Sequence, residues 1–178
     1  ALAELANPAT LDALIGACGD EFWSVRTRAG WGVAKIGGPK AIEALIVLFN
    51  DPIMEVRNEA VAAVVSLGAG QLDRLLAAMK DERWRVREHA AKACGDLHDS
   101  GAVDALIFAC RDRDGAVKSA AAEALGKIGD PKAIPALVKL FRDSSKIVRE
   151  TAGIALVAIG QPSVDLLLET LKDKDFVV

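Results

Sequence analysis

The residues best placed to do chemistry are aspartates that recur every 30 or 31 positions along the chain. Each is followed five positions later by a valine and, wherever the chain continues, by a basic residue directly after that valine. The aspartates are Asp20, Asp51, Asp81, Asp112, Asp143 and Asp173, and the basic residues are Arg26, Arg57, Arg87, Lys118 and Arg149. A row of carboxylates could bind cations. The basic residue at a constant spacing from each carboxylate favours a structural role instead, in which the pairs tie loops to helices.

Histidine and cysteine add little further chemistry. The chain has two histidines, His89 and His98, nine positions apart and without a third, which makes a poor metal site. Its three cysteines form no Cys-x-x-Cys pair, so their sequence context does not indicate a nucleophilic thiol. We therefore expect no catalytic residue, no metal and no cofactor. We also expect His89 to be exposed on a helix and His98 to adopt left-handed geometry in a turn.

The elements that carry the recurring aspartates are predicted to be pairs of helices. Apolar residues follow each valine at four, eight and eleven positions, which is one face of an α-helix. A glycine twelve positions after the valine ends this first helix, and in most repeats a proline opens a second helix with apolar residues at i, i+3 and i+7. These glycines are Gly37, Gly68, Gly129 and Gly160. No strand-like alternation competes, so the fold is predicted to be all-α.

One such helix pair cannot bury its apolar face alone, so the pairs must stack into an α-solenoid that forms a single domain over residues 1–178. The expected units are a partial repeat at 1–19, repeats at 20–50, 51–80, 81–111, 112–142 and 143–172, and the start of a truncated repeat at 173–178. The ends of a solenoid normally carry polar caps, which this chain lacks. We therefore expect the sequence to be a piece of a longer protein.

The units resemble HEAT-like repeats of the short type first associated with phycobilisome lyases. Residues 115–130 (GAVKSAAAEALGKIGD) and 131–143 (PKAIPALVKLFRD) carry the resemblance best, and it covers the whole chain. In that family the loop aspartate and the first-helix arginine form a ladder that links consecutive repeats. The resemblance implies the same pairing here, in a register that the sequence leaves open. Lys118 is the weakest rung, because lysine cannot supply a planar bidentate fork.

Repeats of this kind serve as interaction scaffolds, as bilin lyases or chaperone-like proteins, and occasionally as enzymes. Deoxyhypusine hydroxylase resembles this architecture but holds iron with several His-Glu pairs, which two histidines cannot match. HEAT-like DNA glycosylases need a basic groove, whereas the net charge here is −3, which also disfavours anionic membranes. No apolar run approaches the length of a membrane helix. The cysteines occupy core registers and fit a reducing compartment, so we expect a cytoplasmic protein.

A binding surface is expected where the repeat varies. In related solenoids the second helices line the concave side, and here their variable positions are small and apolar with a basic rim toward the C-terminal half. Large apolar residues at nominally exposed positions are typical of binding surfaces. The expected partner-binding residues are Val47, Met54, Arg74, Trp84, Phe108, Arg111 and Trp23. For the tryptophans, packing between repeats is an equal alternative. Trp31 lies in a solvent-facing column of a first helix, where it could contact another part of the protein or a second copy.

The sequence thus predicts a non-catalytic scaffold that binds an amphipathic helix or an acidic peptide on its concave second-helix surface. The partner would be another protein or another domain of the same longer chain, with no nucleic acid and no membrane involved; the oligomeric state is left open. Two alternatives remain. One is a bilin lyase or chaperone-like bilin-binding protein, and the other, disfavoured by the histidine count, is a metal-dependent hydroxylase.

Overall fold

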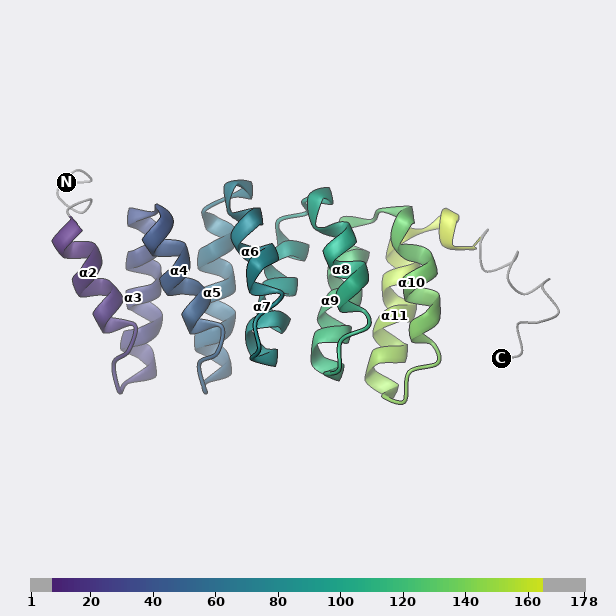
Figure 1. Ribbon diagram of the computed structural model, residues 1–178, viewed down its shortest axis with the longest axis horizontal. Coiled ribbons are helices and arrows are strands. Elements are labelled where there is room, and N and C mark those ends of the chain that lie inside the picture. The colour runs from purple at the N-terminus through teal and green to yellow at the C-terminus, as the bar shows by residue number, and fades with distance from the viewer. Residues whose placement is uncertain (1–7, 165–178) are drawn as a thin grey trace.

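The chain forms antiparallel helix pairs stacked along one axis in the computed structural model, which describes residues 8–164 (Figure 1). The first helices of the pairs are α3 (Trp23–Ile36), α5 (Met54–Ser66), α7 (Trp84–Asp96), α9 (Gly115–Ile128) and α11 (Lys146–Ile159). The second helices are α2 (Pro8–Ala17), α4 (Pro39–Leu48), α6 (Leu72–Ala78), α8 (Val103–Ala109) and α10 (Ile134–Leu140). No strand occurs between residues 8 and 164, and the predicted all-α solenoid is confirmed. The expected truncated repeat at 173–178, with Asp173, lies outside the described residues.

The first helices end where the glycine pattern predicts. Gly37, Gly68, Gly129 and Gly160 all have positive φ, between 73° and 86°. His98 stands at the equivalent position of the repeat at 81–111 and has a φ of 53°, as expected. A side chain in this region clashes with its own backbone, which Gly avoids. The His98 Nδ1 lies 3.0 Å from the carbonyl oxygen of Asp96, a local contact that accompanies the strained conformation.

Small side chains set the distance between neighbouring first helices. The decisive position lies nine residues after the repeat valine and is occupied by Ala34, Val65, Gly95 and Gly126 in successive repeats. A Cβ on Gly95 would lie 2.6 Å from Cα of Ala124, and one on Gly126 would lie 2.8 Å from Cα of Ala155. The backbones of α7, α9 and α11 therefore approach closely. Of the contacts between consecutive first helices, that of α5 with α7, where Val65 stands, is the least extensive.

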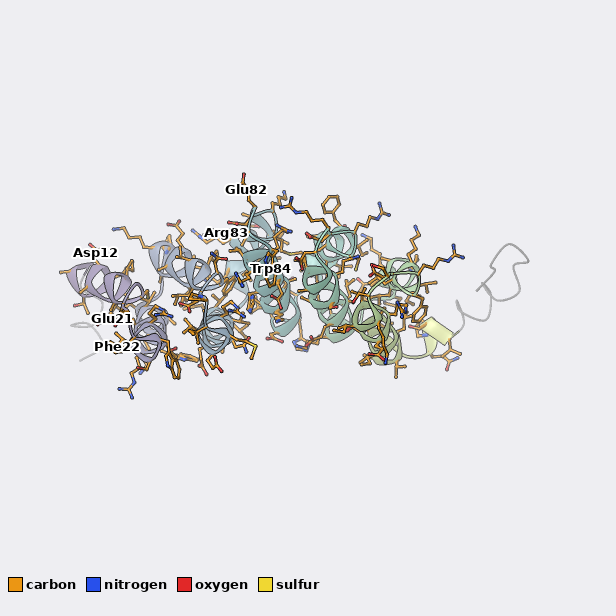
Figure 2. All side chains as sticks on the ribbon, turned by 90° about the horizontal axis from the view of Figure 1, so that it is seen from below. Asp12, Glu21, Phe22, Glu82, Arg83 and Trp84 are labelled. Atoms are coloured by element: carbon orange, nitrogen blue, oxygen red, sulfur yellow. The ribbon has the colours of Figure 1, made fainter. Side chains whose placement is uncertain are left out.

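The second helices form the outer layer, which corrects our expectation that they line the concave side. Each first helix packs extensively on the next, whereas consecutive second helices make few contacts with one another. In a curved double layer the closely packed layer lies on the inner side. Figure 2, seen along the helix pairs, shows a shallow arch with the second helices along its outer side. The glycines and alanines of the first helices cause this curvature, because they let the inner layer close up more than the outer one.

The core is aliphatic and follows the predicted registers. The repeat valines Val56, Val86, Val117 and Val148 are fully buried, as are the alanines four positions later. Val25, in the repeat at 20–50, is exposed by 37%, and Phe141, at the end of α10, by 40%. Both lie toward the ends of the described stack, where fewer neighbouring helices cover them.

Candidate functional site

The recurring aspartates and basic residues form an inter-repeat ladder with a single register. Arg26 donates from Nε and Nη2 to the Asp51 carboxylate at 2.6 and 2.8 Å. Arg87 binds Asp112 in the same bidentate way at 2.7 and 2.8 Å. The Lys118 ammonium pairs with Asp143. Each rung thus joins a first helix to the aspartate 25 residues later, at the start of the next repeat.

The same residues also fix their own loops. The Nη1 atoms of the four ladder arginines donate to the carbonyl oxygens of their own aspartate and of the next residue, at 2.7 to 3.1 Å. The aspartate Oδ1 accepts the backbone N–H two residues later in every described repeat, at 2.8 to 2.9 Å. Burial opposes ionisation of Asp112, but the hydrogen bonds from Arg87 and from the Asp114 N–H outweigh it and lower its pKa. The hydrogen bond from Lys118 lowers the pKa of Asp143. The row is therefore a set of satisfied ion pairs.

One rung is missing. The Asp81 carboxylate is bound by Arg83, two residues away, at 2.9 and 2.8 Å, and not by Arg57. The Arg57 Nε is buried without a hydrogen-bond partner. The sequence contains the cause, because Leu72 follows Val56 by 16 positions, whereas the equivalent residues are separated by 17 in the three repeats whose rungs are intact, those that begin at Asp20, Asp81 and Asp112. The loop between α5 and α6 is thus one residue short, and the spacing from Arg57 to Asp81 falls to 24 positions.

A groove with a volume of about 800 Å³ lies between α6 and α8, on the outer layer. Its apolar lining comes from Leu76, Met79, Ala105, Phe108 and Ala109. The Phe108 side chain is exposed by 79% and is the most solvent-accessible large apolar group on the second helices. The loop between α6 and α7 closes one end of the groove, and Figure 2 shows Glu82 of this loop extending from the outer side of the stack.

The charged residues around the groove leave a basic excess. Its acidic residues are mostly neutralised, since Asp112 pairs with Arg87, Asp81 with Arg83, and Asp104 with Lys132 at 2.6 Å. Three basic residues of the lining, Lys80, Arg111 and Arg113, form no ion pair within residues 8–164. Glu82 is the one lining carboxylate in that range without an ion pair. An acidic ligand would therefore meet a complementary rim.

The structure brings together only part of the predicted binding set. Phe108 and Arg111 line the groove. Leu76 and Met79 also line it but were not predicted, because Met79 occupies a core register of the repeat and Leu76 lies between the variable second-helix positions on which the prediction rested. The predicted residues outside the groove lining are Val47, Met54, Trp23, Arg74 and Trp84. The first three are exposed by 62%, 57% and 49% respectively. The role of all five residues in partner binding stays a prediction.

The tryptophans differ in their surroundings. Trp84 is half-buried against the core, and the Arg85 guanidinium lies 4.7 Å from its ring centroid, which favours the alternative of packing within the stack. Trp31 is also partly buried, and its Nε1–H donates to Glu59 on α5 at 2.8 Å. The described contact of Trp31 is thus one between consecutive repeats.

His89 is buried, contrary to our expectation. It is 1% exposed, its ring packs against Phe49 with centroids 6.1 Å apart, and its Nδ1 lies 2.8 Å from the Arg85 carbonyl oxygen. Burial lowers its pKa, and Nε2 has no partner. Sequence could not show this, because α4 reaches past the shortened repeat to contact α7 directly.

The described residues offer little for catalysis. Burial raises the pKa of the Cys94 and Cys110 thiols to about 12, so the reactive thiolate is scarce at neutral pH. Between residues 8 and 164 no three His, Cys, Asp or Glu side chains are grouped to hold a metal ion. Nor is any helix of that range long and apolar enough to cross a membrane.

Comparisons with known proteins agree with this architecture. No curated protein is similar enough to match the sequence. Among solved structures, the complex of CpcE and CpcF of phycocyanin lyase from Nostoc sp. PCC7120 is 26% identical, with a TM-score of 0.59, over 93% of this chain and 71% of that one. Human deoxyhypusine hydroxylase in complex with glycerol is 20% identical, with a TM-score of 0.52, over 89% of this chain and 76% of that one. A designed armadillo repeat protein in complex with the peptide (KR)4 is 22% identical, with a TM-score of 0.50, over 89% and 90%.

The likenesses to deoxyhypusine hydroxylase and to the designed armadillo repeat protein, at 20% and 22% identity, show the fold alone. The family profile of HEAT repeats matches residues 1–66, 72–156 and 109–178, which together span almost the whole chain. This match confirms the resemblance drawn from the repeat motifs. The chain belongs to the HEAT repeat family.

Proposed function

We propose that the protein is a non-catalytic scaffold whose α6–α8 groove binds an amphipathic helix with acidic residues along its edges. The observation that carries this proposal is Phe108, an aromatic side chain 79% exposed on the wall of an apolar groove. Large apolar groups next to a concave apolar surface are typical of binding hot spots. The helix would come from another protein or from another domain of the same chain.

The basic residues around the groove favour an acidic partner. Lys80 and Arg111 on the groove rim have no intramolecular carboxylate within the described residues, so an acidic ligand gains ion pairs without breaking any. Arg113 uses one Nη2 hydrogen bond, at 3.3 Å, to the Glu82 carbonyl oxygen and keeps further donors for a ligand. Three unpaired thiols are compatible with a reducing compartment, and we propose the cytoplasm.

Selection from a displayed library of amphipathic helices tests the proposal. We expect enriched sequences to combine apolar residues at i, i+3 and i+7 with flanking acidic residues, and their affinity to fall with salt. Phe108→Ala should weaken binding about tenfold or more, as for a hot-spot aromatic residue. Val47→Ala is the matched control, because Val47 is 62% exposed at the equivalent position of α4, outside the groove. Equal loss in both variants, or enrichment of basic helices, would refute the proposed groove.

An open-chain tetrapyrrole is the second candidate ligand. The groove is apolar and has two arginines, Arg111 and Arg113, that could pair with propionate groups, and the phycocyanin lyase complex is similar in sequence and fold. Mixing the protein with a bilin should then shift the bilin absorbance, and Arg111→Ala should reduce the shift. No shift at saturating protein would exclude this candidate.

A further inference from the structure

A second groove lies beside the α6–α8 groove on the outer layer, between α8 and α10 (Figure 1). Its volume is about 250 Å³, and Arg111 and Asp112 line both grooves. All ten residues that line the α8–α10 groove stand 31 positions after a residue that lines the α6–α8 groove. The two grooves are therefore the same site in consecutive repeats, and they meet just after the C-terminal end of α8.

The chemistry of the site changes between these two repeats. Lys139 lines the α8–α10 groove at the position where the α6–α8 groove has Phe108. The α8–α10 groove also has no counterpart of Glu82, because Arg113 occupies the equivalent position in the sequence. An apolar groove with an aromatic wall is thus followed by a basic groove without that wall.

The α8–α10 groove has an uncompensated positive charge. Both of its carboxylates, Asp112 and Asp143, are bound by the ladder residues of the preceding repeats. Lys139 and Arg111 form no ion pair with any residue in the range 8–164. An acidic ligand could therefore pair with these two side chains without displacing an existing ion pair.

The size of the α8–α10 groove favours an extended segment over a second helix. Its volume of about 250 Å³ compares with about 800 Å³ for the α6–α8 groove, and an α-helix with its side chains is about 10–12 Å wide. Packed helices lie about 8–10 Å apart, and an extended chain spans about 3.3–3.6 Å per residue. About three extended residues therefore lead from one groove to the next.

We propose that the partner of the α6–α8 groove has an acidic segment directly beyond one end of its helix, and that this segment crosses the C-terminal end of α8 and binds Lys139 in the α8–α10 groove. The inference rests on the proposed function, because Phe108 holds the helix from which the segment extends. Acidic residues about three to six positions beyond the helix reach Arg111 first and Lys139 next. The partner then lies in one direction along the solenoid, with its acidic segment toward the C-terminal repeats.

An extension library built on the most enriched displayed helix tests this direction. About six positions, enough to cross one repeat, are randomised among Glu, Gln, Lys and Ala beyond either end of that helix, and both pools are selected on the full chain. We expect Glu to be enriched beyond one end only, since the two grooves meet at one end of α8. Enrichment of Glu beyond neither end, or equally beyond both, would overturn the inference.

Lys139→Glu tests the site, and Lys35→Glu is its matched control. Both lysines are exposed in the last turn of a helix, and neither forms an ion pair within the part of the chain that the structure describes. We expect Lys139→Glu to weaken binding of the acid-extended helix about fivefold or more, and to change binding of the unextended helix less than about twofold. Equal affinity of the extended helix for the two variants would contradict the proposed site.

The two failures are distinguishable. Loss of binding in Phe108→Ala, together with equal binding of the extended helix by Lys139→Glu and Lys35→Glu, would retain the α6–α8 groove as a binding site and overturn the acidic segment. If the library yields no helix, or if Phe108→Ala binds as tightly as the unsubstituted protein, the proposed function fails and the inference fails with it.

Discussion

The intact and the broken rung allow a matched measurement of what one rung contributes. Asp112→Asn removes the charge that neutralises Arg87, whose side chain is 8% exposed, while the Asp112 side chain is 13% exposed. Breaking a buried ion pair costs about 3–5 kcal/mol, because one charge is left uncompensated. The partial exposure of Asp112 and the amide oxygen that Asn retains place the expected loss at the low end, at about 3 kcal/mol.

Asp81→Asn is the control. Asp81 accepts the N–H of Arg83 at 2.8 Å just as Asp112 accepts that of Asp114 at 2.9 Å, and an Asn side chain can keep this bond in both variants. Among the described residues, 8–164, the ion-pair partner of Asp81 is the side chain of Arg83, which is 49% exposed, and such surface pairs contribute about 0–1 kcal/mol. The two substitutions therefore differ mainly in the inter-repeat rung.

Urea denaturation followed by circular dichroism measures both losses. A difference of about 2 kcal/mol is large compared with a total stability of about 5–15 kcal/mol for a domain. The comparison holds if the slope with urea is unchanged, since repeat arrays lose two-state behaviour when one junction is weakened. Equal shifts for Asp112→Asn and Asp81→Asn would refute the idea that the ladder orders the stack through its charge pairs.

Three further outcomes follow from the packing and from the buried titratable groups. Gly126→Ala places a Cβ 2.8 Å from the α11 backbone and should lower the free energy of unfolding by about 1–3 kcal/mol, whereas Gly16→Ala, with open space around it, should be neutral or stabilising in the same urea titration. Alkylation near neutral pH, read by mass spectrometry, should leave Cys94 and Cys110 unmodified until urea unfolds the chain, because burial raises their pKa to about 12. Burial lowers the pKa of His89, so the unfolded state binds the proton more readily and stability should fall as the pH drops below about 6.5. His89→Gln should flatten that slope between about pH 5 and 7 relative to the unsubstituted protein, with His98 common to both.

Sequence periodicity predicted the helices well, because the same pattern of apolar residues recurs in every repeat. The apolar spacing after each valine and the glycine twelve positions later fix where a first helix lies and where it ends. The left-handed backbone of His98 was also predictable, because His98 occupies the position at which the other repeats have glycine. Local backbone preference decides such features, and the sequence states it directly.

The contacts between repeats could not be predicted in the same way. The ladder register depends on how far one helix pair is displaced from the next, which no single repeat encodes. The short loop before Leu72 was visible as a repeat of 30 residues instead of 31, yet a loop can absorb one residue without consequence. Only the positions of the Arg57 and Asp81 side chains show that the missing residue has a consequence here, because these two side chains do not pair. His89 was misjudged for the same reason, because Phe49 reaches it from a helix pair that is not its neighbour in the sequence.

The groove itself follows from residues that never touch it. Gly95 and Gly126 draw α7, α9 and α11 together on the inner side of the arch. Because each second helix is joined to a first helix by a short loop, a tight inner layer makes the outer helices diverge, and the space between α6 and α8 is left for a ligand. Val65 interrupts this series of small residues one repeat earlier, and the contact between α5 and α7 is the least extensive of those between consecutive first helices. The width of the groove is therefore set by the inner helices, and its specificity by Phe108 and the basic residues of the outer ones.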